Sequence, residues 1–246
     1  MHTVVIAVGA VTGALAGGWL RAVVWRLAVG QDEPDRVACA GCDAVLLTGG
    51  SWWRGRLATT GRCPGCGARV GAPDGLMELA AGAALAAVAG VVGPRPELLA
   101  FWSLTLLGVA LTAIDVRVHR LPDRLTLPAY PVLAALLAAA AVVSGEWARL
   151  GVAVAAGAAT GLAYLALVLL RPDQLGLGDA KLAGLLGAAL GWFGWMPALL
   201  ATALAFAGCA VVGLGLLVTR RGGLRTAVPL GPFMVAGALA ALLMTL

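Results

Sequence analysis

The chain has 246 residues, of which 61% are hydrophobic and only 12% are charged, and its formal net charge is +5. A soluble domain carries roughly 25% charged residues, because these residues cover its surface. The composition therefore excludes a conventional cytosolic enzyme, a disordered protein and a nucleic-acid-binding domain. We predict an all-α polytopic membrane protein, surrounded by the lipid bilayer, with a small polar insert and no nucleic-acid partner.

Eight apolar stretches approach the roughly 20 residues that a membrane helix needs. In chain order they are 4–25, 76–92, 98–115, 125–143, 150–170, 180–192, 196–218 and 229–246. The sixth is short and rich in glycine and alanine, so its limits are the hardest to predict. These stretches predict a first transmembrane helix in residues 1–25, a cytoplasmic insert in residues 26–75 and a seven-helix membrane domain in residues 76–246.

The basic residues predict the orientation of these helices. The first positive charge is Arg21, at the far end of the first apolar run, which favours a retained helix over a cleaved signal peptide. If that helix begins outside, 15 of the 17 basic residues fall in or next to cytoplasmic loops, and only Arg95 and Arg149 fall outside. Because cytoplasmic loops carry an excess of Lys and Arg, we predict a multi-pass protein of the cytoplasmic membrane with both termini outside.

The polar insert contains two Cys-x-x-Cys pairs. Cys39 and Cys42 form the first pair, and Cys63 and Cys66 form the second. Two such pairs about 20 residues apart are typical of a four-thiolate zinc site, and four thiolates leave no coordination position for water, so the predicted role of the zinc is structural. Two disulfides are the alternative, which a reducing cytoplasm disfavours.

Two acidic residues at the ends of apolar stretches are candidates for chemistry. Asp115 ends the third stretch and Asp179 precedes the sixth, so the predicted orientation puts both at the cytoplasmic face. Two facing carboxylates that share a proton can activate water for attack on a peptide carbonyl. Helix capping is the alternative for Asp179, and likewise for Asp123. Asp115 has no such explanation, because the dipole at a helix C-terminus disfavours negative charge.

Four motifs in this order resemble the type IV prepilin peptidases, which are intramembrane aspartic proteases of the Gly-x-Gly-Asp class. Asp115 is followed by Leu121-Pro-Asp-Arg-Leu-Thr-Leu-Pro128, and Gly176-Leu-Gly-Asp-Ala-Lys-Leu182 carries the Gly-x-Gly-Asp-x-Lys-Leu pattern. Pro229-Leu-Gly-Pro-Phe233 matches a late element of the family. The paired Cys-x-x-Cys insert after the first helix is typical of its longer members.

The resemblance implies a bacterial membrane endopeptidase that removes the short basic leader from prepilins or pseudopilins, after a glycine at the cytoplasmic face. It implies that Asp115 and Asp179 are the catalytic pair of a peptidase domain in residues 76–246. The supporting motif positions that it implies are Gly176, Gly178, Lys181, Pro122 and Asp123. Many members then N-methylate the new terminus with S-adenosylmethionine, an activity that the family ties to the N-terminal half.

The chain departs from the family pattern in this N-terminal half. The family often shows Gly-Ser-Phe-x-Asn-Val followed by Arg-Leu-Pro in the first helix, and here Arg26 and Leu27 remain while the Asn and the Pro do not. After the second cysteine pair, only Glu78 and Leu79 remain of a Tyr-Pro-x-x-Glu-Leu pattern. Glu78 is therefore the residue that we connect with methyl transfer.

Two other functions stay open from the sequence. One is a zinc-containing membrane assembly or binding module of a pilus or type II secretion system, in which the aspartates only cap helices. The other is a transporter that relays protons, but its acids should lie at mid-membrane depth rather than at helix ends. The sequence predicts neither the particular pilin nor the oligomeric state.

Overall fold

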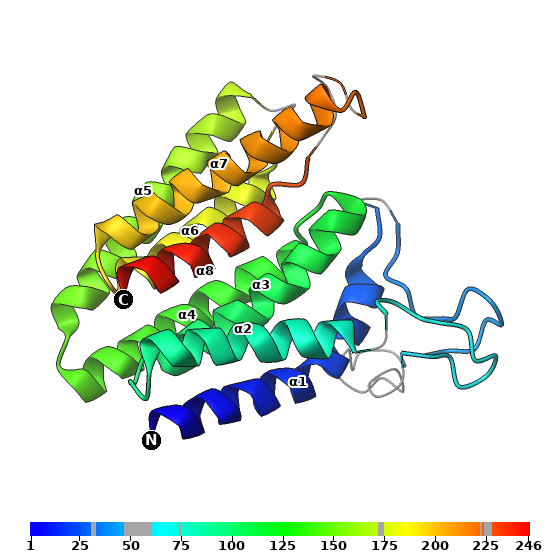
Figure 1. The fold of residues 1–246 in the computed structure, drawn as a ribbon, viewed down its shortest axis with the longest axis horizontal. Coiled ribbons are helices and arrows are strands. Elements are labelled where there is room, and N and C mark those ends of the chain that lie inside the picture. The colour runs from blue at the N-terminus through cyan, green and yellow to red at the C-terminus, as the bar shows by residue number, and fades with distance from the viewer. Residues whose placement is uncertain (31–32, 47–60, 74, 172–174, 222, 224–227) are drawn as a thin grey trace. The chain divides into compact units, whose positions relative to one another are not determined.

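The computed structural model describes residues 1–246 except for 31–32, 47–60, 74, 172–174, 222 and 224–227. The described residues form eight α-helices (Figure 1), and their β-structure is limited to two isolated bridges. The helices are α1 (His2–Leu27), α2 (Leu76–Val92), α3 (Leu98–Val118), α4 (Asp123–Ser144), α5 (Trp147–Leu170), α6 (Leu177–Gly191), α7 (Trp195–Val218) and α8 (Gly231–Thr245). The predicted all-helical fold is confirmed.

The helices differ in how well their lengths match a membrane. Among the described residues, α1, α3, α4, α5 and α7 are long and apolar enough to cross one. The helices α2 and α8 are apolar but have 17 and 15 residues. At 1.5 Å per residue these helices are about 26 and 22 Å long, a little less than the hydrocarbon core of a bilayer. The chain is thus a multi-pass helical membrane protein.

One predicted boundary changes in a way that matters for the site. The sixth helix was expected to begin at Ala180, but α6 begins at Leu177. Asp179, which was expected to open this helix, therefore lies inside its first turn.

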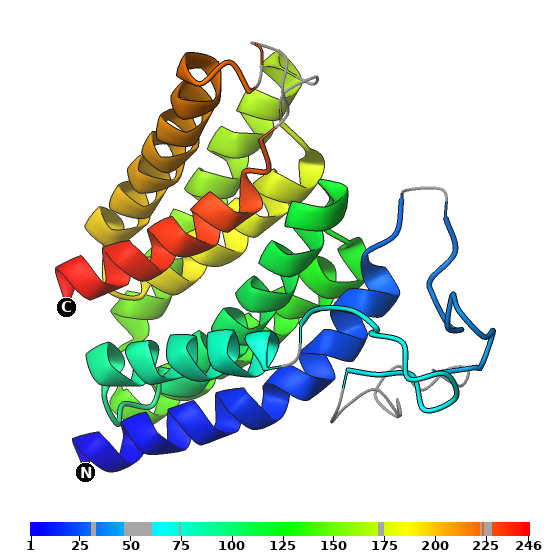
Figure 2. The ribbon, with the colours of Figure 1, turned by 45° about the vertical axis from the view of Figure 1, so that its right-hand side comes forward.

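The chain forms two compact units, and the first contains Met1–Pro94 and Thr105–Arg120. In this unit α1 and α2 lie side by side in both views (Figures 1 and 2). Their contact is close because a Cβ atom at Gly17 would lie only 2.8 Å from the carbonyl carbon of Met77. Small residues let membrane helices approach each other in this way.

The second unit contains Arg95–Leu104 and Leu121–Leu246, and α6 forms its core. This helix contacts α4, α5, α7 and α8, and nine of its 15 residues are buried. Its partner α5 approaches closely at Gly157, where a Cβ atom would lie 2.7 Å from the Cβ atom of Ala188. The unit thus holds the first turn of α6 in a packed helical framework.

Candidate functional site

Asp179 lies at the third position of α6, in its first turn. Its Oδ2 accepts a hydrogen bond of 3.0 Å from the backbone N–H of Gly176, and its own N–H donates to the Gly176 carbonyl. A carboxylate at this position satisfies one of the orphan N–H groups of a helix start and is favoured by the helix dipole. The capping role considered for Asp179 is therefore present, and the side chain remains half-buried rather than enclosed.

The Leu-Pro-Asp motif packs directly onto the start of α6. A Cβ atom at Gly178 would lie 2.8 Å from the Cβ atom of Leu121, so only glycine allows this approach. Asp123 is the first residue of α4, and its Oδ1 lies 2.6 Å from Nζ of Lys181. Pro122, not Asp123, is the N-cap residue of α4, and Asp123 makes an ion pair rather than the expected cap. Two motifs more than 50 residues apart in sequence thus meet in one unit.

Tyr130 is a third contact at this position, which the sequence analysis did not identify. Its hydroxyl donates a hydrogen bond of 2.8 Å to the backbone carbonyl of Lys181, and it lies against the backbone of Gly184. The chain has only two tyrosines, and a tyrosine in an apolar helix needs a partner for its hydroxyl. That requirement was the available signal for the contact.

Asp115 is buried, with 5% of its surface exposed, in the last turn of α3. The helix continues for three residues beyond the predicted end, to Val118. His119 then takes a left-handed conformation with φ of 50°, while its N–H still donates to the Asp115 carbonyl. Asp115 belongs to the first unit and Asp179 to the second.

The four cysteines of the insert form a cluster that can hold a metal ion. The Sγ atoms of Cys39, Cys42, Cys63 and Cys66 all lie within 4.8 Å of one another. The Cys39–Cys66 and Cys42–Cys63 sulfur pairs are 3.7 and 3.5 Å apart. A tetrahedral site with Zn–S bonds near 2.3 Å requires sulfur atoms about 3.8 Å apart. The geometry fits a four-thiolate site, and all four cysteines are unbridged.

The two cysteine pairs repeat one backbone pattern with a spacing of 24 residues. The N–H of Cys39 donates to the carbonyl of Ala44 at 2.9 Å, and the N–H of Cys63 donates to that of Ala68 at 2.8 Å. A bridge flanks each turn, between Ala38 and Val45 in the first and between Arg62 and Arg69 in the second. We call each of these turns a knuckle. Each knuckle contributes one Cys-x-x-Cys pair to the cluster, and the short sulfur–sulfur contacts join the two knuckles.

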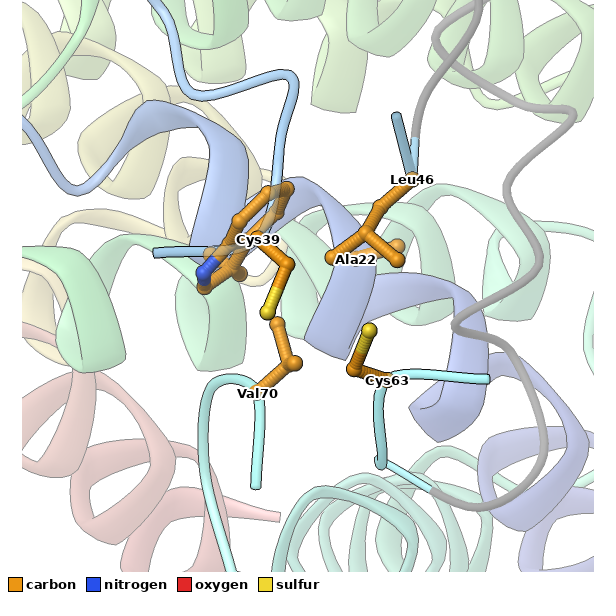
Figure 3. Close-up of a cluster of buried hydrophobic side chains, with 6 residues drawn as sticks. Ala22, Cys39, Leu46, Cys63 and Val70 are labelled. Atoms are coloured by element: carbon orange, nitrogen blue, oxygen red, sulfur yellow. The ribbon is translucent and has the colours of Figure 1, made fainter. Parts of the chain in front are cut away.

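The knuckles pack against the end of α1. Cys39 and Cys63 are buried in one cluster with Leu46, Val70 and the α1 residues Ala22 and Trp25 (Figure 3). Backbone N–H groups, chiefly that of Cys66, lower the pKa of the Cys63 thiol to about 6. The Ala44 N–H acts on Cys42 in the same direction, but the neighbouring thiols outweigh it and raise the pKa of Cys42 to about 12. Within the Cys42–Cys63 pair, Cys63 is therefore the thiol that loses its proton more easily.

Glu78, the residue connected with methyl transfer, forms a buried ion pair. Nη2 of Arg21 in α1 donates to both carboxylate oxygens of Glu78 in α2. Arg21 is 2% exposed and Glu78 is 25% exposed. From the sequence, Arg21 was interpreted only as a marker of orientation, although a charge in an apolar helix indicates a partner.

These features define a polytopic membrane protein whose insert has a four-cysteine cluster able to hold a metal ion and whose sixth helix begins at a Gly-x-Gly-Asp sequence. A model of the type IV leader peptidase family matches residues 98–214. The chain belongs to this family, as the resemblance of its motifs predicted.

Among similar proteins is the prepilin leader peptidase/N-methyltransferase of Burkholderia pseudomallei (strain 1026b), which is 40% identical over 196 residues, or 76% of this chain and 59% of the relative. The protein of the same name from Aeromonas hydrophila is 32% identical over 234 residues, or 87% and 75%. That from Myxococcus xanthus (strain DK1622) is 31% identical over 223 residues, or 88% and 64%. The chain thus spans 59% of the length of the Burkholderia relative. No solved structure matches it.

Proposed function

We propose that this protein is a membrane-embedded aspartic endopeptidase that removes the short basic leader from type IV prepilins or pseudopilins. The observation that carries the proposal is the docking of Gly178 against Leu121, which fixes the first turn of α6 and with it Asp179. The relatives' name supports the substrate class. In this proposal the cut follows a glycine at the cytoplasmic face of the bacterial inner membrane, and both termini of the chain are outside.

The proposed chemistry uses Asp115 and Asp179 as a pair around one water molecule. One carboxylate takes a proton from the water as its oxygen attacks the peptide carbonyl carbon, and the other, protonated, donates to the carbonyl oxygen. The helix dipole favours Asp179 as the ionised member, because it lies at a helix start, and Asp115 as the protonated member, because it lies at a helix end. The pair titrates jointly, so this assignment is a bias between two states.

The test is cleavage of a prepilin by the protein in membranes. We expect Asp115→Asn and Asp179→Asn each to abolish cleavage, because an amide can neither take nor share the proton. Glu146→Gln is the matched control, since Glu146 is an exposed acid that pairs with Arg149 at the start of α5. Cleavage that continues at the wild-type rate in both Asn variants would refute the peptidase and favour the assembly module.

Two further parts of the proposal concern cofactors. Cys39, Cys42, Cys63 and Cys66 would hold a zinc ion with a structural role, because four thiolates fill its coordination sphere. The relatives' name includes an N-methyltransferase, so methylation of the new pilin terminus with S-adenosylmethionine is a second activity to test. Mass spectrometry of the cleaved pilin detects the added mass of a methyl group, about 14 Da, in the same experiment. Glu78, the residue connected with this activity, is held by Arg21.

A further inference from the structure

A groove with a volume of about 560 Å³ lies between α4 and the α5–α6 pair. All of its lining residues belong to the second compact unit. Its α4 wall carries leucines such as Leu133 and Leu137, and its α5 wall carries leucines such as Leu150 and Leu162. The groove is therefore apolar on both walls, and its glycines lie where α5 packs on α6.

The groove runs along α5 and begins beside the proposed catalytic residue. It extends from Leu150 to Leu165 along α5, which corresponds to about 22 Å of helix. Ala180 and Lys181, which directly follow Asp179 in the chain, line the end of the groove beside the start of α6. Polar lining groups gather at this end, and the remainder is apolar. A chain lying in the groove would be polar at Asp179 and apolar further on.

The charges at this end argue against an anionic lipid headgroup as the occupant. Lys181 is the one charged residue among the lining residues, and its Nζ already pairs with Oδ1 of Asp123 at 2.6 Å. A phosphate would have to displace this carboxylate. The leucine-rich walls beyond this end instead suit the apolar side chains of a membrane-embedded helix, because van der Waals packing holds such helices together.

We propose that this groove receives the apolar helix of the prepilin that follows the cleaved bond, an inference that rests on the proposed peptidase function. An α-helix of about 10 Å diameter and 22 Å length occupies roughly 1,700 Å³. The groove is about a third of this volume, so it takes one face of the substrate helix and leaves the rest to the bilayer. The groove would direct the bond before this helix toward Asp179.

Two exposed alanines of α5 provide a matched test. Ala158 lines the groove, whereas Ala163 does not and, five residues later, points about 140° away around the helix. A photoreactive amino acid is introduced at either position, and the protein is illuminated with excess prepilin in vesicles of phosphatidylethanolamine and phosphatidylglycerol. We expect a covalent adduct with the prepilin from position 158 and none from position 163.

A kinetic measurement accompanies the cross-linking. Ala158→Trp should lower prepilin cleavage about tenfold, because the indole would occupy space that the substrate helix needs, while Ala163→Trp should leave cleavage within about twofold of wild type. Thermal unfolding establishes that both variants are folded. Adducts with lipid alone at position 158, equal adducts at both positions, or equal cleavage by both variants would overturn the groove while the wild-type peptidase stands. Absence of cleavage by the wild type would instead overturn the peptidase, and this proposal with it.

Discussion

The buried ion pair between Arg21 and Glu78 predicts a large loss of stability when one partner is removed. In Glu78→Ala, the guanidinium of Arg21 loses its carboxylate while it remains 2% exposed. Its Nε and Nη1 atoms are already buried without a hydrogen-bond partner among the described residues, so no described group compensates. We therefore expect Glu78→Ala to destabilise the contact between α1 and α2.

The magnitude follows from the burial of the two partners. Breaking a buried pair costs about 3–5 kcal/mol, and because Glu78 is a quarter exposed we expect a value near the lower end. For a chain of this length that loss lowers Tm by roughly 6–12 °C. The double variant Arg21→Leu with Glu78→Leu removes both charges and leaves apolar side chains, so its Tm should lie within about 3 °C of wild type.

The assay is thermal unfolding of the purified protein in detergent, followed by intrinsic tryptophan fluorescence. Glu146→Ala is the control, since it breaks an exposed pair with Arg149 that is worth at most about 1 kcal/mol. The reasoning is refuted if Glu78→Ala unfolds at the temperature of this control. It is also refuted if the double variant is less stable than the single one.

Three other sets of variants test separate parts of the structure. Elemental mass spectrometry should find one zinc ion per chain in the wild type and none in Cys63→Ser. Zinc retained by this variant would contradict a four-thiolate site. Gly157→Leu should lower the stability of the α5–α6 pair by about 1–3 kcal/mol, because its Cβ would meet Ala188 at 2.7 Å. Gly151→Leu, on the same helix but with open space around it, should leave Tm unchanged, and equal losses in both would exclude the packing argument. Reversing the charge of Asp123 or of Lys181 alone should slow prepilin cleavage about two- to fivefold, and exchanging the two charges should restore the rate; a double variant no better than the single ones would contradict a role for the pair.

The helices and the cysteine cluster were predictable because local rules determine them. A membrane helix needs a long apolar run, so the eight stretches identified all eight helices. A two-residue gap between cysteines brings their sulfur atoms together, so spacing alone predicted the cluster of Cys39, Cys42, Cys63 and Cys66.

The contacts between motifs were not predictable, because they depend on how distant helices pack. The apolar stretch placed the start of α6 at Ala180, three residues late, because the apolar run does not show that Gly178 packs against Leu121 at the helix start. Nothing in the spacing shows that Asp123 pairs with Lys181, because the two residues lie on different helices. Likewise, the distribution of basic residues explained Arg21 as a marker of topology, so it gave no reason to expect the ion pair with Glu78.

The way in which the insert joins the helices makes it a replaceable module. Where it leaves α1, the N–H of Arg36 returns to the carbonyl of Arg26. Where it rejoins α2, a Cβ at Gly71 would lie 3.5 Å from the Cβ atom of Trp25, so both junctions lie at the same end of α1. A loop whose ends already meet changes its closure free energy only slowly with length. Lineages could therefore lengthen, shorten or exchange the knuckles while the two helices beneath them keep their positions.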